Sequence, residues 1–141
     1  MTYKLKQQGF TIVELLIVIV VIGILAALVI TTFTGIQRKA RDTERETDIK
    51  ALHSQVEAYY AQNGGYPALS DINITTLKGL DAGALLAPAS ATPIDSTAST
   101  ISKYSYVPTP STCTTAAKDC TSYVLSSLLE SGSSFTKNSL N

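Results

Sequence analysis

The 141-residue chain lacks tryptophan and is poor in the residues that most often bind metals, with one histidine and two cysteines. His53, Cys113 and Cys120 are too few soft ligands to complete a zinc shell. We therefore expect no metal site and no cofactor. His53 follows Leu52 in a helical pattern, where we expect a structural or solvated side chain and no catalytic role.

The carboxylates that could bind calcium are also widely separated along the chain. A calcium site gathers several carboxylate and carbonyl oxygens within a short stretch of chain. The candidate loop carboxylates here are scattered, at Asp71, Asp81, Asp95 and Asp119. The sequence therefore predicts no calcium site.

The chain has no net charge, since eleven basic residues balance eleven acidic ones. Binding to nucleic-acid backbones needs a basic surface, so we expect no direct nucleic-acid partner. The sequence also lacks a phosphate-binding G-x-x-x-x-G-K motif and a Rossmann glycine series. With no nucleophile and base in a recognisable arrangement, we expect that the protein is not an enzyme.

One long apolar run dominates the N-terminal part. Leu15–Ile36 contains 22 consecutive uncharged residues, which as a helix would extend about 33 Å and span a membrane. Lys4 and Lys6 precede the run, whereas Arg38, Lys39 and Arg41 follow it, so the distribution of positive charge leaves the orientation open. A secretory signal would be cut after its apolar region, but this run continues unbroken past its only small-residue pair, Ala26-Ala27.

The helical pattern continues beyond the apolar run. Charged residues follow, and two pairs are spaced four apart for contact on one helix face, Arg38 with Asp42 and Glu46 with Lys50. An apolar stripe at helical spacing comes next, formed by Ile49, Leu52, Val56 and Tyr59. Asn63-Gly64-Gly65 and Pro67 end the pattern. We expect one helix over Phe10–Gln62, apolar all round in its first half and amphipathic in its second.

The sequence pattern of the residues after this helix predicts a small sheet. A loop with one helical turn near Thr75–Gly79 leads to Pro88–Ser122, where 15 of 35 residues are Ser or Thr, as in an exposed connector. Alternation predicts strands at 103–107, 123–129 and 134–137. A three-stranded antiparallel sheet packed on the apolar stripe gives an α+β fold. We expect the six tyrosines after residue 50 to pack in this core: Tyr59, Tyr60, Tyr66, Tyr104, Tyr106 and Tyr123.

The two cysteines are separated by six residues, late in the chain. In an oxidising compartment beyond a membrane, Cys113 and Cys120 would form one disulfide. In a reducing compartment they would remain free thiols.

The segment from Gly9-Phe10-Thr11-Ile12-Val13-Glu14 through Ala27 resembles the N-terminal signature of type IV pilins and of the pseudopilins of type II secretion. The close resemblance covers about residues 5–30. It implies cleavage between Gly9 and Phe10 by a membrane-embedded prepilin peptidase and N-methylation of Phe10. It also implies a pilin fold, with a leader at 1–9, a membrane and filament-core helix at 10–36, an amphipathic half at 37–63 and a β-rich domain at 64–141.

Glu14 is the one acidic residue within the apolar signature. A carboxylate near the bilayer centre costs up to roughly 3 kcal/mol, and less toward an edge. Cleavage before Phe10 would create a positive amine nearby, and the resemblance implies that Glu14 pairs with this amine on a neighbouring subunit and sets axial register. The alternative is a solvated carboxylate at the helix start, favoured by the helix dipole.

The resemblance implies a structural subunit that is stored in the cytoplasmic membrane and assembled into an extracellular pilus. Its expected partners are other pilin subunits, the prepilin peptidase, an assembly platform and a separate ATPase, and its roles would include adhesion, twitching motility or DNA uptake. The alternatives are a secretion pseudopilin and a single-pass anchored domain or enzyme without a polymer. Many pilins have proline where Thr31 stands, and Gly23 and Gly35 are the expected weak points of this helix.

Overall fold

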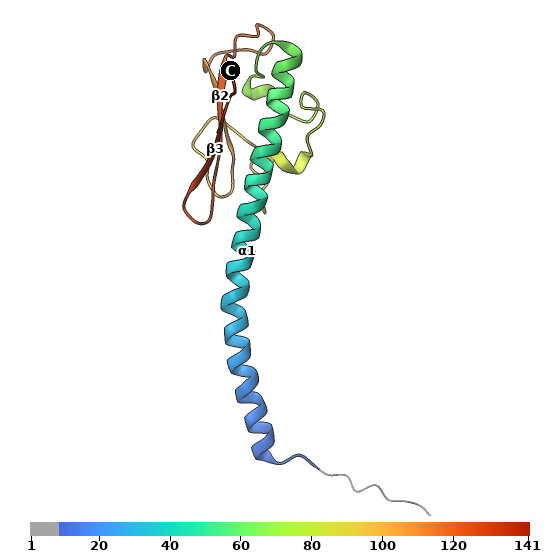
Figure 1. The fold of residues 1–141 in the computed structure, drawn as a ribbon, viewed down its shortest axis with the longest axis vertical. Helices are drawn as coiled ribbons and strands as arrows, with labels where there is room; N and C mark the ends of the chain where they lie inside the picture. Colours follow the sequence, from blue (N-terminus) through green and yellow to red (C-terminus); the bar gives the residue numbers. More distant parts are fainter. Residues whose placement is uncertain (1–8) are drawn as a thin grey trace, which may run out of the picture. The chain divides into compact units, whose positions relative to one another are not determined.

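The computed structural model describes residues 9–141, except for the side chain of Thr31. The predicted basic leader, with Lys4 and Lys6, lies outside the described residues. The elements follow in the order α1 (Ile12–Asn63), η1 (Leu69–Asp71), η2 (Ala82–Leu85), β1 (Ser105–Thr109), β2 (Ser122–Leu128) and β3 (Ser134–Asn138) (Figure 1). The chain divides into two compact units, Met1–Gln37 and Arg38–Asn141.

Helix α1 begins and ends at residues whose chemistry explains its limits. Thr11 precedes its first residue and caps it, as described below. At the other end, the Gly64 N–H donates to the Tyr60 carbonyl at 2.8 Å, with Gly64 at φ 78°, the left-handed conformation that commonly closes a helix. The Asn63 side chain adds a hydrogen bond to the Tyr59 carbonyl at 2.9 Å. The expected helix over Phe10–Gln62 is thus confirmed to within two residues at each end.

The apolar stripe of α1 forms the centre of the core in the C-terminal unit. Ile49, Leu52 and Val56 are at most 1% exposed, and Tyr59 packs at the edge. Four tyrosines, all fully buried, complete the aromatic part of this core: Tyr66, Tyr104, Tyr106 and Tyr123. The predicted packing of the sheet on the stripe is confirmed, because burying both apolar faces is what stabilises a two-layer α+β unit.

The sheet has the order β1-β2-β3, with both pairs antiparallel. In β2 the buried positions alternate, at Tyr123, Leu125 and Ser127, so one face packs on the core. A turn with Gly132 at φ 87° joins β2 to β3. Three strands and one α-helix give the α+β fold that the pattern predicted, with the pilin-like arrangement that the resemblance implies.

Two local predictions were wrong. The first strand begins at Ser105, not at residue 103, because Lys103 pairs with Thr100 in a tight turn: the Thr100 N–H donates to the Lys103 carbonyl at 2.9 Å. The strand also continues through Pro108, which an edge strand tolerates. At Thr75–Gly79 there is one turn without a helix, closed by the bond from the Leu77 N–H to the Asn73 carbonyl.

Candidate assembly site

Thr11 and Glu14 form a reciprocal cap at the start of α1. The Glu14 N–H donates to the Thr11 hydroxyl oxygen at 3.2 Å, and Glu14 Oε2 accepts from the Thr11 N–H at 2.9 Å and from its hydroxyl at 2.6 Å. This is a capping box, in which a Thr and a Glu three residues later satisfy backbone donors that the first helical turn leaves unpaired. Glu14 is thereby held against the N-terminal end of the helix.

The cap uses only one oxygen of the Glu14 carboxylate. Both the N–H and the hydroxyl of Thr11 donate to Oε2, and no described residue donates a hydrogen bond to Oε1. Glu14 is exposed, as is Phe10. An ionised carboxylate can accept about four hydrogen bonds, so Oε1 remains able to bind a further donor.

The surface around Glu14 is apolar. The large apolar side chains from Ile12 to Ile36 are between 48% and 87% exposed, although soluble proteins rarely expose so large a continuous patch. Phe10, Glu14 and three aliphatic side chains line a shallow depression on it, at Leu15, Ile17 and Val18. By length and composition this part of α1 is able to cross a membrane, and no described residue of the chain covers it.

A charged network joins α1 to two loops in the C-terminal unit. Arg45 is 2% exposed, and it donates to Asp42 at 3.0 Å, to Glu130 at 3.2 Å and to the Ile101 carbonyl at 2.9 Å. Arg41 binds both oxygens of Glu130, at 2.5 and 2.8 Å. The hydrogen bond from Arg41, followed by that from Arg45, lowers the pKa of Glu130 to about 2.

The predicted pair of Arg38 with Asp42 is therefore wrong. Asp42 Oδ1 is taken by Arg45 and by the Glu130 N–H, at 2.8 Å, and the Asp42 side chain is buried while Arg38 is exposed. A buried carboxylate needs its charge compensated at close range, which the tertiary contact with Arg45 provides. The other predicted pair is present, with Lys50 and Glu46 at 3.4 Å.

Glu57 anchors the end of the chain to α1. It accepts hydrogen bonds from the Tyr123 hydroxyl at 2.8 Å, from the Tyr66 hydroxyl at 3.1 Å and from the Leu140 N–H at 3.2 Å. Burial, followed by the bond to Glu57, raises the pKa of Tyr123. His53 lies one helical turn before Glu57 and shares a 3.1 Å hydrogen bond with the Asn138 carbonyl. These partners fit the structural role expected for His53.

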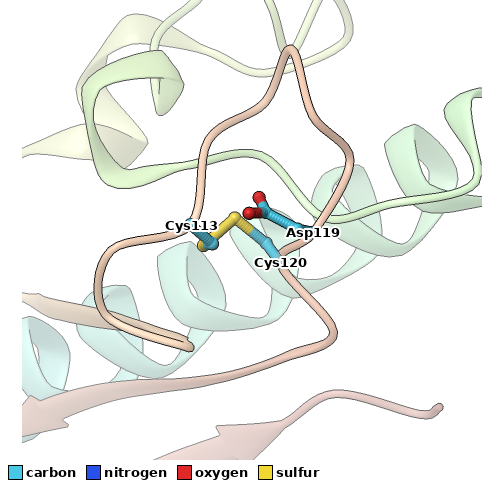
Figure 2. A group of neighbouring side chains, drawn as sticks. All are labelled: Cys113, Asp119 and Cys120. Carbon is cyan, nitrogen blue, oxygen red and sulfur yellow. A yellow bond between two sulfur atoms is a disulfide. The ribbon is translucent and has the colours of Figure 1, made fainter.

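Cys113 and Cys120 form a disulfide, with their Cα atoms 5.0 Å apart, and Figure 2 shows it beside Asp119. The thiol alternative is excluded for this structure. These three residues are close enough to suggest a metal site, but both sulfur atoms are committed to each other, and Asp119 accepts from the Thr114 N–H at 2.7 Å. A disulfide sulfur is not a thiolate ligand, so this cluster does not fit a metal.

Comparison with known proteins places the N-terminal segment in a family. Residues 4–30 match the prokaryotic N-terminal methylation motif. The N-terminal segment of this chain therefore carries this methylation motif, and the chain is similar to pilins and pseudopilins. It is 40% identical to the type II secretion system core protein G of Aeromonas hydrophila over 79 residues, which are 56% of this chain and 50% of that protein. Core protein G of Escherichia coli K12 is also 40% identical, over 54% of this chain and 48% of its own length.

A second kind of relative is also similar to this chain. The type IV major pilin protein PilA of Myxococcus xanthus is 36% identical over 61 residues, which are 43% of this pilin-like chain and 28% of PilA. The chain thus spans about half, or less, of the length of these relatives. No solved structure matches it.

The structure brings only some of the predicted site residues together. Phe10 and Glu14 line one depression, whereas Gly23 and Gly35 lie further along α1, with open space where a side chain would be. Sequence reasoning missed the role of Thr11, although the signal was present: Thr followed three residues later by Glu, before an apolar run, is the capping-box pattern. It also missed the network at Arg45, which no local pattern connects to residue 130.

Proposed function

We propose that this pilin-like chain is a structural subunit of a filament, assembled through the exposed apolar surface of Ile12–Ile36. The observation that carries the proposal is this surface itself, which no described part of the chain covers. It needs either lipid or other helices around it to stay out of water. Storage in the inner membrane would surround this surface with lipid, and transfer into a bundle of identical helices would then surround it with other helices. Neither step needs a catalytic residue of this chain.

We infer that maturation prepares the N-terminus for this transfer. Cleavage between Gly9 and Phe10 by a prepilin peptidase would create an α-amine, which the family motif implies is methylated on Phe10. The unoccupied Oε1 of Glu14 is a suitable acceptor for the amine of a neighbouring subunit, because a charge-assisted bond in an apolar setting is stronger than one in water. An assembly platform and a separate ATPase would supply the work of extraction.

Two kinds of filament are candidates. A type IV pilus on the cell surface would serve adhesion, twitching motility or DNA uptake, and PilA is the relative that supports it. A pseudopilus of type II secretion is supported by the core protein G relatives at 40% identity. Deletion of the gene distinguishes them: loss of surface fibres favours the pilus, and loss of secreted proteins without loss of fibres favours the pseudopilus. A third candidate, a single-pass anchored domain, would form no filament of either kind.

The decisive variant is Glu14→Gln. Glutamine keeps an acceptor for the capping box but removes the charge that would pair with the neighbouring amine. Since removing one partner of a buried ion pair costs about 3 kcal/mol or more, we expect filaments to fall at least tenfold. Thr11→Ala is the matched control, because it removes the cap hydroxyl, costs about 1 kcal/mol of helix stability and leaves the charge in place.

The measurement is the amount of subunit in sheared filaments, compared with the amount in the membrane. Filament loss in Glu14→Gln with near-normal filaments in Thr11→Ala supports charge pairing. The reverse result would show that Glu14 serves mainly as a helix cap. Normal filaments in both variants would remove the assembly role of Glu14 altogether.

A further inference from the structure

A polar cleft lies in the C-terminal unit, between the C-terminal end of α1 and the loop that follows η1. Its volume is about 470 Å³, within the range of about 300–1,000 Å³ that is usual for small-molecule sites. On the loop side it is lined by residues 75–79. On the helix side the lining residues share one face of α1, at Gln55, Ala58, Tyr59, Gln62 and Asn63. Both walls belong to the same compact unit.

Local contacts hold the loop wall in place. The Asn73 side-chain oxygen accepts from the N–H groups two and three residues later, at 2.9 and 3.0 Å, and the Leu77 N–H donates to the Asn73 carbonyl at 2.9 Å. Leu77 is 1% exposed and anchors the loop in the core. Gly79 allows a close approach to α1, because a Cβ atom there would lie 2.7 Å from the Gln55 amide nitrogen. These contacts shape the wall without a ligand.

The polar side chains of the cleft have hydrogen-bonding capacity to spare. Six of them make no hydrogen bond or ion pair with any described residue: Gln55, Tyr59, Gln62, Thr75, Thr76 and Lys78. Gln55, Tyr59 and Thr76 are half-buried. A half-buried side chain has fewer rotamers open to it than an exposed one, so it loses less entropy when a ligand orders it.

The chemistry of these groups selects the kind of ligand. Amides and hydroxyls both donate and accept hydrogen bonds, as the hydroxyl groups of a sugar do. The Tyr59 ring adds an apolar surface with a polar tip, which suits the C–H face of a sugar ring and its hydroxyls. Among the described residues, no carboxylate lines the cleft, and Lys78 is its one charged side chain. An ammonium group without a counter-ion favours a ligand with negative charge.

We propose that this cleft binds a sugar that carries a carboxylate, with Lys78 beside the acid group and the amides and hydroxyls on the ring hydroxyls. A uronic acid is the simplest member of this class. The inference goes beyond the proposed function, because it concerns ligand binding by the C-terminal unit and needs no filament. On a filament outside the cell, such a site would give the subunit an affinity for acidic polysaccharides.

A panel of matched sugars tests the site. Glucuronic, galacturonic and mannuronic acid are each compared with the neutral parent sugar: glucose, galactose and mannose. Saturation-transfer NMR on the full chain, in a detergent without sugar head groups, gives the dissociation constants. We expect at least one acid to bind, and to bind up to about fivefold more tightly than its parent, which is the contribution of an exposed ion pair.

Substitutions locate the binding. Lys78→Gln should abolish the preference for the acid and leave the affinity for the neutral sugar unchanged. Gln55→Met and Thr76→Val keep the size of the side chain but remove its polar group, so each should weaken both sugars about two- to tenfold. Lys39→Gln is the matched control, because Lys39 is exposed and lies sixteen residues before Gln55 on α1, about 24 Å along the helix. Circular dichroism checks that all variants fold.

Several results would overturn the proposal. One is that none of the six sugars binds. Another is a preference for the acid that survives Lys78→Gln, or sugar binding that is unchanged in both Gln55→Met and Thr76→Val, because the sugar then binds elsewhere. Sulfate that binds as tightly as the best uronic acid would show a site for simple anions and would also overturn the assignment. None of these measurements involves filaments, so this proposal and the proposed function can fail separately.

Discussion

At the scale of single residues, Ser127 is the clearest weak point of the core. Its side chain is fully buried on β2, and its hydroxyl oxygen has no hydrogen-bond partner among the described residues. A buried polar group left unpaired costs about 1 kcal/mol or more, so Ser127→Ala should raise the free energy of unfolding by about 1 kcal/mol. Denaturant unfolding of the full chain in detergent measures the change.

The neighbouring serine gives the control. Ser126 is half-buried, and its hydroxyl bonds to the Ser99 hydroxyl at 3.3 Å. Ser126→Ala should therefore leave stability within about 0.5 kcal/mol of the original. A destabilised Ser127→Ala variant would mean that the buried hydroxyl has a partner, such as a bound water.

The lowered pKa of Glu130 predicts that the stability of the folded chain depends on pH. Its pKa is lowered from an ordinary 4.5 to about 2, chiefly by the hydrogen bond from Arg41. A carboxylate with a lower pKa in the folded state stabilises that state above pH 4.5 and loses its contribution as the pH falls from 4.5 toward 2. Glu130→Gln should therefore lower the melting temperature at neutral pH, and the difference from the normal chain should shrink across this interval. A difference that stays constant down to pH 2 would contradict the assignment.

At the scale of elements, α1 is the part that sequence reasoning predicts best. Its apolar run, its stripe at Ile49, Leu52 and Val56, and its end just before Gly64 follow from local periodicity and backbone preference. The pairing of Asp42 could not be predicted in this way. Arg38 has the correct helical spacing, but Asp42 pairs with Arg45. The turn after β2 brings Glu130 to the Arg45 guanidinium, and the turn before β1 brings the Ile101 carbonyl to it.

The disulfide loop is the element whose contribution is most easily isolated. It docks on the segment after α1: the Tyr66 N–H donates to the Cys120 carbonyl at 3.1 Å, and the Ala68 N–H donates to the Thr115 hydroxyl at 2.8 Å. Closing so short a loop stabilises by about 2.5 kcal/mol at most in the chain-entropy model. We expect Cys113→Ser/Cys120→Ser to lower the free energy of unfolding by up to that amount.

Treatment of the normal chain with a reductant should have the same effect as the double substitution, and it should have no effect on the substituted chain. Asp119→Asn provides a further comparison, because it keeps an acceptor for the Thr114 N–H and leaves both sulfur atoms untouched. If the reductant lowers the free energy of unfolding of the normal and the substituted chain equally, this loss of stability does not come from the disulfide.

At the scale of the whole molecule, the fold class follows from the sequence, because a long apolar helix and a short alternating sheet have strong local signals. The first strand was placed two residues early, since only the tertiary pairing of Lys103 with Thr100 shows where the ladder starts. The kind of filament that we propose does not follow from these signals, because the chain is similar both to core protein G and to a type IV major pilin.

The proposed pairing of Glu14 depends on a cationic amine that would exist only after cleavage before Phe10. Mass spectrometry of the N-terminal peptide from sheared filaments tests this directly. We predict a peptide that begins at Phe10 and carries one methyl group on its amine. Assembled filaments whose subunits still begin at Met1 would contradict the account, since Glu14 would then have no such amine to bind.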